Sequence, residues 1–440
     1  MTKKFQRGLA LFLAVLTAAG CFGISVSATD AGGAGSETGG KEITISYSSN
    51  AIATAKELQE AISYEDYVSR YSDESLYPNA SSSVKISGTD YYAADTTAKV
   101  SAVEFEGEKA LNTTSDGTVA YKISVPETAR YCIKIRYWPN ETSSSSTSIQ
   151  RIFRINGSVP FSEAYNIGIS KVWKTVYDEA NFKTTKDGNL RKFKTDIDNN
   201  EIRSPIVQSP EWREYIVKDI DGFYKDPFVF VFEKGDNIIS FEAVSDEMSI
   251  GSIELVPFEK MISYADYASK YAGEAKGTDV VKIEAEYPYA TSTNTIYPIE
   301  DRSSGVNSPT DTHRVILNTL GGEKWQVSQQ WVEYRFSVSS DGMYQIVPRF
   351  RQHVNDGMYS SRVLYIFSDG VAEGEKGYYN GIPFDEAREL RFNYDSDWNA
   401  LPIRFGTVTK DAKGNTSIEY EECEFFFKAG VTYTTRRCLV

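Results

Sequence analysis

Histidine and cysteine are scarce in this sequence. Its 440 residues include only two histidines and four cysteines. So few histidines limit His-based catalytic triads and zinc sites, and neither G-x-S-x-G nor H-E-x-x-H occurs. The cysteines are too few to form a disulfide framework. No catalytic constellation is visible, so we expect a protein that is not an enzyme. A glycosidase needs only two well-placed carboxylates, however, and the 61 acidic residues leave that alternative open.

Basic residues and long apolar runs are also few. The 61 acidic residues outnumber 47 basic ones, and the net charge of -14 repels phosphate backbones and anionic lipid headgroups. We therefore expect no nucleic-acid partner. Beyond the N-terminus no stretch is apolar enough to span a bilayer. Aromatic residues are abundant, at 13 %, and 29 of them are tyrosines. They favour strands and sugar-facing surfaces, because each offers a flat apolar face with a polar edge.

Residues 1–28 have the form of a signal peptide. Three basic residues precede an apolar run over residues 9–19, which is too short for a comfortable transmembrane span. Two cleavage sites compete. Val26-Ser-Ala28 suits ordinary signal peptidase, whereas Ala18-Ala-Gly-Cys21 resembles a bacterial lipobox and would leave a lipid anchor on Cys21. We favour the first and predict a secreted or cell-surface protein.

After the signal the chain has a flexible tether and then repeats itself. Residues 29–50 form the tether, which begins with a Gly- and Ser-rich stretch. The stretch ISYEDYVSRY at residues 62–71 returns as ISYADYASKY at residues 262–271, and later segments match as well. A period this long exceeds the roughly 20–50 residues of solenoid repeats and indicates a duplicated domain. We predict one domain over residues 51–260 and a second over residues 261–440.

Each repeat is predicted to begin with a short helix and to continue as a β-sandwich. Ser63 and Ser263 stand three residues before Asp66 and Asp266, as N-caps stand before an acidic first turn. Beyond them, apolar and polar residues alternate in short runs separated by Gly, Asn and Asp. The predicted fold class is all-β, with two tandem antiparallel β-sandwiches, each preceded by a short helix.

The two repeats end differently. Residues 233–237 of the first repeat are followed by 22 residues up to Glu259, enough for two strands, whereas the matching residues 428–430 are followed by only ten. Residues 436–440 also break the alternating pattern. We therefore expect the second domain to be truncated at its C-terminal strand, which would leave an open sheet edge that favours aggregation.

Several motifs resemble known proteins. Trp331–Val338 with Asp341–Tyr344, and Glu233–Ile238 in the first repeat, resemble β-sandwich carbohydrate-binding modules of families 6 and 35, which have a galactose-binding-like jelly roll. The whole arrangement resembles the long N-terminal region of extracellular solute-binding proteins of sugar ABC transporters in Gram-positive bacteria. This second resemblance covers most of residues 60–435 and rests on Ser148–Gly157 with Pro160-Phe161, Gly188-Asn189, Pro210–Trp212, Asp301–Ser304, Asn318–Gly322 with Trp325, Arg351-Gln352 and Ser360–Arg362.

The resemblance implies an exported, non-catalytic protein that binds an oligo- or polysaccharide. A transporter permease would be a partner if a solute-binding domain followed, but none follows here, so transport itself is not carried over. The first repeat carries Lys85–Asp90 where the modules usually have an acidic first strand, so the two repeats are expected to differ in ligand behaviour. Two alternatives stay open: structural or adhesion modules of the cell surface without sugar affinity, and a carbohydrate-binding fragment of a glycan-degrading enzyme.

Glu284 and Glu286 are the candidate metal ligands. On a strand their carboxylates would point to the same face, about 7 Å apart. Hard oxygen ligands so placed suit calcium. In the resembled modules this pair, together with an acidic residue of the closing strand, holds a structural calcium. The alternative is two solvated glutamates on an exposed strand face.

Six tryptophans are candidates for stacking on sugar rings. The C–H faces of sugars pack against aromatic planes, while Arg, Asn and Gln side chains bind the hydroxyl groups. For the second repeat we predict a binding surface made of Trp325, Trp331, Trp398, Arg351, Gln352 and Asn318. The counterparts in the first repeat are Trp138, Trp173 and Trp212. The alternative for each tryptophan is a place in the core.

Overall fold

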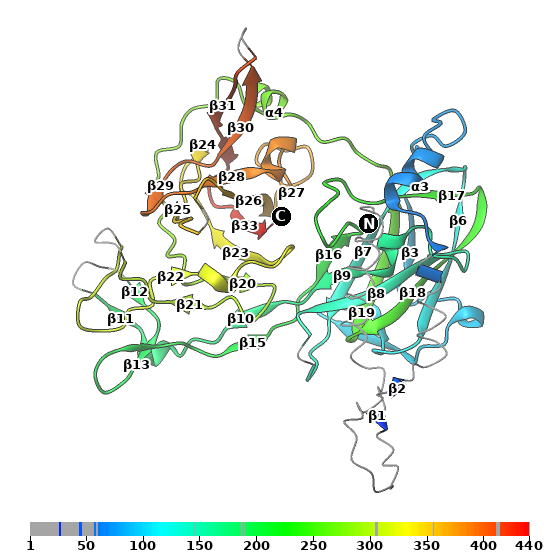
Figure 1. Cartoon of the computed structure of the whole chain (residues 1–440), viewed down its shortest axis with the longest axis horizontal. Helices are drawn as coiled ribbons and strands as arrows, with labels where there is room; N and C mark the ends of the chain where they lie inside the picture. Colours follow the sequence, from blue (N-terminus) through cyan, green and yellow to red (C-terminus); the bar gives the residue numbers. More distant parts are fainter. Residues whose placement is uncertain are drawn as a thin grey trace, which may run out of the picture. The chain divides into compact units, whose positions relative to one another are not determined.

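The computed structural model describes residues 26–27, 44–45, 57–58, 60–144, 146–185, 188, 190–303, 307–354, 356–410 and 414–439. Most of the predicted signal and tether, including Cys21, lies outside these residues. Two short strands there, β1 (Val26–Ser27) and β2 (Thr44–Ile45), pair with each other. The described part is built of antiparallel strands with two α-helices, α3 (Tyr64–Arg70) and α4 (Tyr264–Lys270), which confirms the all-β fold class (Figure 1). None of its helices has the length and apolarity needed to cross a membrane.

The chain folds into two compact units, and each draws on several segments. The first comprises residues up to Ile169 together with 213–217 and 228–258, and the second comprises 170–212, 218–227 and 259–440. One of the boundaries between the units lies between Phe258 and Glu259. The predicted assignment differs for two segments, because residues 170–212 and 218–227 belong to the first repeat by sequence and to the second unit by contact.

Both helices are held by the same tyrosine contacts. In the first unit the Ser63 hydroxyl accepts the Asp66 N–H at 3.1 Å and caps α3, as predicted. The buried hydroxyls of Tyr64 and Tyr67 accept backbone N–H groups of β17 (Val229–Phe232), each at 2.9 Å. The second unit repeats these contacts with its own helix: Glu424 N–H to Tyr264 at 3.0 Å and Phe426 N–H to Tyr267 at 3.1 Å. In each unit the tyrosines of the repeated ISYxDY motif thus hold a short helix against a strand.

The first unit is a sandwich of two antiparallel sheets around a core rich in phenylalanine. The four-stranded sheet has the order β6 (Thr118–Val125), β18 (Gly235–Ser245), β8 (Ser148–Ile155), β9 (Ile167–Ser170). The seven-stranded sheet has the order β16 (Arg213–Ile216), β7 (Ala129–Pro139), β19 (Met248–Val256), β5 (Glu108–Thr113), β4 (Val100–Phe105), with β17 also on β7 and β3 (Val84–Ser87) also on β19. Strand β19 is therefore central to this sheet.

The main sheet of the second unit combines strands of both repeats. Its order is β15 (Ile206–Gln208), β10 (Trp173–Thr175), β20 (Ala290–Thr291), β23 (Trp331–Phe336), β33 (Thr432–Leu439), β26 (Tyr359–Asp369), β27 (Asn380–Gly381), with β28 (Leu390–Asn393) also on β26. Trp173 of β10 pairs with Thr291 of β20, so the first repeat contributes two strands to this sheet. That pairing explains why residues 170–212 belong to the second unit.

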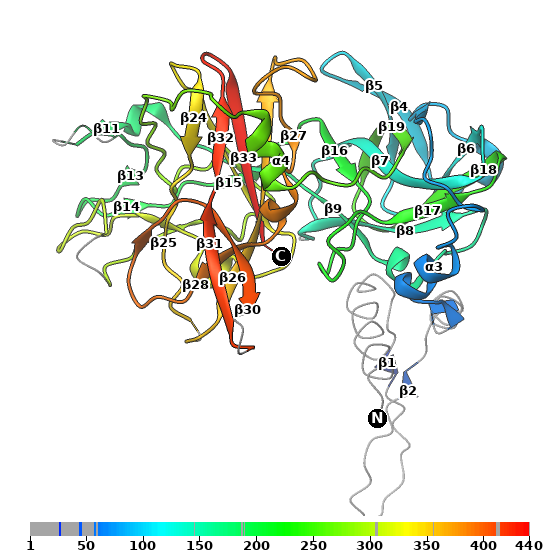
Figure 2. The same cartoon turned by 90° about the horizontal axis from the view of Figure 1, so that it is seen from above.

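Four strand pairs complete the part of the second unit that carries the pocket described below. They are β24 (Gly342–Gln345) with β32 (Glu424–Phe427), β25 (Arg349–Phe350) with β29 (Asn399–Ala400), β30 (Arg404–Lys410) with β31 (Thr416–Glu422), and β21 (Pro298–Ile299) with β22 (Thr319–Leu320). In Figure 2 the ribbon of β30 and β31 extends beyond the other strands of this unit. Two further pairs lie in the segment from the first repeat: β11 (Lys183–Thr184) with β12 (Leu190–Arg191), and β13 (Lys194–Thr195) with β14 (Glu201–Ile202).

The C-terminal residues form a strand, although their sequence breaks the alternating pattern. Strand β33 lies between β23 and β26 and pairs with both, so it is not a sheet edge. Arg436 breaks the alternating pattern because its charge is paired inside the sheet: its guanidinium binds the fully buried Glu333 at 2.7 Å. A strand with a buried ion pair does not follow the polar–apolar rule, which explains the break in the pattern at Arg436.

Candidate functional site

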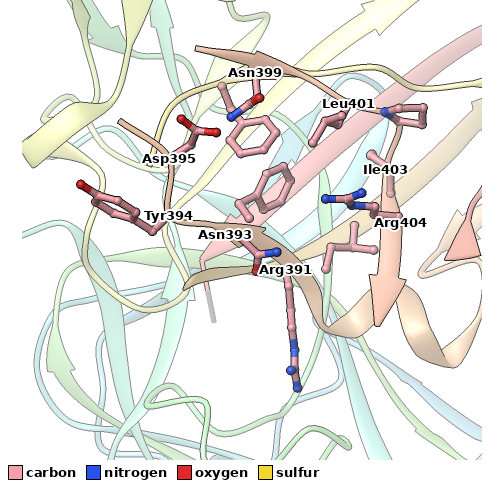
Figure 3. Close-up of a pocket in the computed structure, with 12 residues that line it drawn as sticks. Arg391, Asn393, Tyr394, Asp395, Asn399, Leu401, Ile403 and Arg404 are labelled. Carbon is pink, nitrogen blue, oxygen red and sulfur yellow. The ribbon is translucent and has the colours of Figure 1, made fainter. Parts of the chain in front are cut away.

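A pocket of about 240 Å³ lies in the second unit where β25, β28, β29 and β30 meet (Figure 3). Phe350 and Asn399 face each other across the pairing of β25 with β29. The turn that follows β28 is fixed by two bonds: Asp395 N–H donates to the Gln352 carbonyl at 2.8 Å, and the Asp395 carboxylate accepts Asp397 N–H at 3.0 Å. Strand pairing and this turn therefore bring residues 350 and 390–404 to one place.

The floor of the pocket is apolar. The rings of Phe350 and Phe392 meet edge to face, with centroids 4.7 Å apart at 87°. Leu390 and Ile403 are buried beside them. Such an edge-to-face pair is a stable arrangement for two aromatic rings, and both residues line the pocket.

Polar side chains line the rest of the pocket: Asn393, Asp395, Asn399 and Arg404. The Asn399 amide beside Asp395 holds the pKa of that carboxyl below its ordinary value, so Asp395 is a charged acceptor at neutral pH. Asn393 Nδ2 donates to the Tyr420 hydroxyl at 2.7 Å, and the Arg404 guanidinium lies 4.3 Å from the Tyr420 ring centroid. In Figure 3 Arg391 and Tyr394 extend away from Leu401 and Arg404. Donors and acceptors beside an aromatic floor suit a small polyhydroxylated ligand.

Three of the predicted residues lie beside this pocket. Arg351 and Gln352 follow Phe350 directly, and Trp398 precedes Asn399. Arg351 pairs with Asp301 at 3.1 Å, and its guanidinium lies 5.7 Å from the centroid of the Trp398 ring. Trp398 is half-buried. These residues form a charged and aromatic flank of the pocket, although none of them is among its lining residues.

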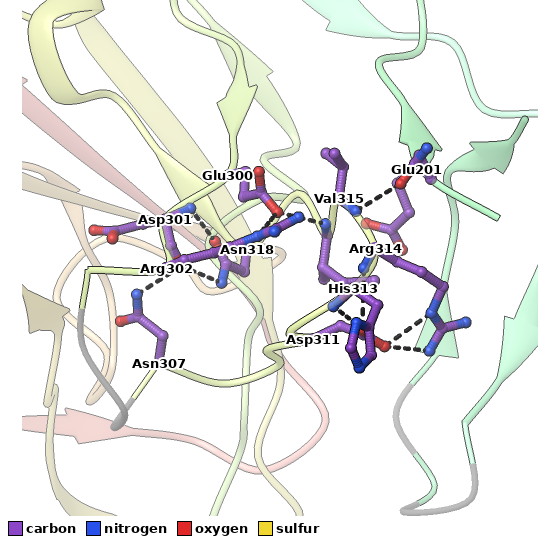
Figure 4. Close-up of polar contacts among 12 residues, drawn as sticks. Glu201, Glu300, Asp301, Arg302, Asn307, Asp311, His313, Arg314, Val315 and Asn318 are labelled. Carbon is purple, nitrogen blue, oxygen red and sulfur yellow. Dashed lines mark hydrogen bonds and ion pairs between the residues drawn. The ribbon is translucent and has the colours of Figure 1, made fainter. Parts of the chain in front are cut away.

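Asn318 organises the loop that carries Asp301 (Figure 4). Its Oδ1 accepts Asp301 N–H at 2.8 Å, and its Nδ2 donates to the carbonyls of Asp301 at 3.0 Å and Pro309 at 2.8 Å. The same loop is tied to the segment from the first repeat, because Glu201 N–H donates to the Val315 carbonyl at 2.9 Å. The side-chain amide of Asn318 is thus fully bonded to backbone groups. These bonds position Asp301, which in turn pairs with Arg351.

Trp325 and Trp331 contact residues that do not line the pocket. The indole N–H of Trp325 donates to the Gln330 carbonyl at 3.1 Å, and the Arg362 guanidinium lies 4.7 Å from its ring centroid. Trp331 is 4 % exposed and packs in an apolar cluster with Val172. The prediction that Trp331 lies on a ligand-facing surface is therefore wrong. Its face of the sheet is covered by the segment that the sequence assigns to the first repeat.

The three predicted tryptophans of the first repeat do not share a unit. Trp138 lies in β7 of the first unit and stacks on Phe105, with centroids 4.6 Å apart at 3°. Trp173 and Trp212 belong to the segment that packs in the second unit. The predicted counterpart site of Trp138, Trp173 and Trp212 is therefore not formed within one unit.

Glu284 and Glu286 do not lie on the strand that the calcium prediction requires. Glu284 and Glu286 lie in a turn closed by Tyr287 N–H on the Glu284 carbonyl at 3.1 Å, so the strand on which the prediction relied is missing there. Glu284 pairs with Lys282 at 2.6 Å. Glu286 is buried, and its carboxylate accepts Arg191 Nη1 at 2.5 Å. Across the described residues no group of three or more His, Cys, Asp or Glu is placed to hold a metal ion.

The positive charge next to Glu286 is that of Arg191, at the place where the prediction put a calcium ion. Arg191 also forms two bonds to the Glu201 carboxylate, at 2.8 and 2.7 Å, and donates to the Leu317 carbonyl at 2.9 Å. Burial raises the pKa of Glu286, an effect that the charge of Arg191 opposes. Burial also works against the charge of Arg191, but its two carboxylate partners outweigh it and raise the pKa of the guanidinium. The triad of Arg191, Glu201 and Glu286 thus docks the first-repeat segment in the second unit.

No motif in the sequence predicts the residues that line the pocket. Asp395, Asn399 and Arg404 belong to no catalytic or binding motif. One signal was present: residues 392–399 read FNYDSDWN, a run that mixes aromatic, amide and acidic side chains. Such a run between two strands favours a binding loop.

The fold and pocket define an all-β protein of two sandwich units with a small polar pocket in the second. No protein-family model matches the chain, and a search of curated proteins finds no match. Among solved structures, a family 35 carbohydrate-binding module from Clostridium thermocellum is 13 % identical with a TM-score of 0.23, over 40 % of this chain and 98 % of the module. A carbohydrate-binding module of Cellvibrio mixtus lichenase 5A, in complex with cellotriose, is 9 % identical with a TM-score of 0.18, over 40 % of this chain and 97 % of the module. A Paenibacillus xanthan lyase is 12 % identical with a TM-score of 0.24, over 83 % of this chain and 27 % of the lyase.

Proposed function

We propose that this protein binds carbohydrate through the pocket between β25, β28, β29 and β30. The observation that carries the proposal is the joining of an aromatic floor, Phe350 with Phe392, to a polar wall of Asn393, Asp395 and Asn399. A sugar ring has apolar C–H faces and an equatorial belt of hydroxyl groups, and the two halves of this pocket complement those two surfaces. Arg404 adds a donor to the wall.

The size of the pocket favours one sugar residue or a chain end. Its volume of about 240 Å³ is somewhat below the range of about 300–1,000 Å³ that is usual for drug-sized ligands. Longer glycans would extend beyond it. The neighbouring flank of Arg351 and Trp398 offers a guanidinium and a half-buried indole for a second residue. We therefore assign Arg351 and Trp398 to an adjoining subsite.

We further propose that binding is the whole of its activity. The pocket lining contains a single carboxylate, Asp395, whereas glycoside hydrolysis generally uses a pair of them. The basic and apolar N-terminus supports export to the cell surface. The motif resemblance supports a place in the N-terminal region of an extracellular solute-binding protein of a sugar ABC transporter in a Gram-positive bacterium, with a permease as its distant partner.

A glycan array tests the proposal. Residues 29–440 would be applied to the array and any retained glycan titrated by calorimetry. Asn399→Ala removes an amide from the pocket wall and is expected to weaken binding about tenfold, since an unpaired ligand hydroxyl costs about 1–3 kcal/mol. The matched control Gln345→Ala removes an exposed amide that binds Glu422 at 2.9 Å outside the pocket. It is expected to bind as the parent does. Absence of any retained glycan, or equal affinity of the two variants, would refute the proposal and favour structural modules.

A further inference from the structure

Two arginines, Arg362 and Arg437, lie on one face of the main sheet of the second unit. Arg437 of β33 stands opposite Val332 of β23 and Leu364 of β26, and both of these apolar residues are fully buried. Residues paired directly across strands project to the same face, and residues two apart on one strand do so as well. Arg362, two residues before Leu364 in β26, is therefore the diagonal neighbour of Arg437. Long side chains in such positions are within reach of each other.

No negative charge among the described residues is paired with these two arginines. Neither guanidinium has a carboxylate partner there, and the side chain of Arg437 has no hydrogen bond there either. Arg436, which projects to the opposite face of the same strand, differs because Glu333 neutralises it at 2.7 Å. Burial lowers the pKa of Arg362 and of Arg437, and the charge of Arg437 lowers the pKa of Arg362 further, to about 10. The fold thus holds two like charges together at a cost in free energy.

The guanidinium of Arg362 is held in place by its surroundings. Its Nη1 donates to the Ser360 hydroxyl and to the Ser361 carbonyl, the latter at 2.9 Å. The ring centroid of Trp325 lies 4.7 Å from the guanidinium carbon, as in a cation–π contact. Both hydrogen bonds come from one nitrogen, so Nε and Nη2 are left to donate to a ligand. Arg362 and Arg437 are both partly exposed, so the pair is not sealed from water.

We propose that Arg362 and Arg437 form a second ligand site, which binds a small oxyanionic group: a sulfate, a phosphate or the carboxylate of an acidic sugar. The planar fork of a guanidinium matches two oxygens of such a group. An anion between the two side chains accepts their N–H groups and neutralises both charges. Because Arg362 is already oriented, it loses little freedom when the anion binds.

This site is distinct from the pocket described above. Neither arginine lines that pocket, although Leu390, which stands opposite Arg362, does. A free inorganic anion and an acidic sugar share the chemistry that the two arginines recognise. Two probes, sulfate and glucuronate, separate these sources.

Calorimetric titration of the full chain with sodium sulfate and, separately, with sodium glucuronate tests the proposal at constant ionic strength. We expect saturable binding of at least one probe: sulfate alone identifies a free inorganic anion, and glucuronate alone identifies an acidic sugar. Arg437→Met keeps most of the side-chain volume and should weaken binding about tenfold or more, because one of two charged donors is lost. The matched control Arg335→Met removes an exposed arginine of β23 that lies 3.6 Å from the Tyr289 ring centroid, and it should bind as the parent does.

Urea unfolding shows whether the variant still folds. Without anion, Arg437→Met should unfold at the same urea concentration as the parent or at a higher one, because the repulsion is relieved. Saturating anion should raise the midpoint of the parent more than that of the variant. Absence of saturable binding of both probes, or equal affinity of Arg437→Met and the parent, would overturn the proposal. Asn399→Ala should keep its affinity for the anion, so this proposal and that of the sugar pocket can fail separately.

Discussion

Replacing Arg191 with methionine tests the idea that the segment from the first repeat is fastened into the second unit by a buried ion triad. The side chains of Arg191, Glu201 and Glu286 are only 8 %, 4 % and 2 % exposed. Methionine keeps most of the side-chain volume but leaves two carboxylates in the interior without a cation. Breaking a buried pair in this way costs about 3–5 kcal/mol, because the remaining charge has lost both its water and its partner. We expect the second unit to lose stability by about that amount.

The assay is urea unfolding followed by amide hydrogen exchange, so that each unit is measured separately. The first unit serves as an internal reference. Arg314→Met is the matched control, because it removes an arginine that pairs with Asp311 at the surface, and exposed pairs contribute little. The double variant Arg191→Met with Glu286→Gln should regain part of the loss, since one of the two unpaired charges is then removed. A loss below about 1 kcal/mol, or one equal to that of the control, would show that the triad does not hold the segment in place.

Four other outcomes follow from the structure. Trp398→Ala should weaken glycan binding, measured by titration, with little change in melting temperature. Trp331→Ala should instead lower the free energy of unfolding in urea by about 3–5 kcal/mol, because Trp331 is buried. The reverse pattern would contradict the placement of these two residues. Burial alone would raise the pKa of Asp301, but bonds from Ser303 and the charge of Arg351 hold it below its ordinary value of 3.8. A carboxyl group whose pKa is lowered by folding stabilises the folded state at pH values above its unfolded pKa. The contribution of the Asp301–Arg351 pair to stability should therefore be constant from pH 7 to about 4 and decrease at lower pH. In urea unfolding at a series of pH values, a decrease of this contribution that begins well above about pH 4 would contradict the prediction. A chelator should leave the melting temperature unchanged; a lower value would restore the calcium hypothesis. Gly277→Ala should lower the stability of the second unit by about 1–3 kcal/mol in urea unfolding, because the added Cβ would overlap the ring of Tyr344, and an unchanged midpoint would contradict this.

Local patterns made the elements predictable. The N-cap at Ser63 and the alternation of Val119–Val125 depend on residues close in sequence, and both the helix and the strand are found where they were expected. The duplication also predicted two sandwiches. The sequence did not reveal why Tyr64 and Tyr67 are repeated, because their partners are backbone amides of β17, more than 160 residues away.

Long-range pairing explains the wrong predictions. The sequence places Glu286 and Trp331 in the second repeat, but Arg191 and Val172, which contact them, come from the first repeat. Internal alignment assumes that each copy folds on its own residues, and a segment that joins the other unit violates that assumption. The pocket could not be predicted from local sequence for a related reason. Asn399 lines it because β29 pairs with β25, which places Asn399 opposite Phe350.

The pocket of the second unit is the proposed sugar-binding site. A crystal structure of residues 29–440 soaked with a glycan retained on the array tests it most directly. We expect one sugar residue against Phe350 and Phe392, with hydroxyl groups bonded to Asn393, Asp395 or Asn399. A sugar bound elsewhere on the protein, with this pocket filled only by water, would contradict it.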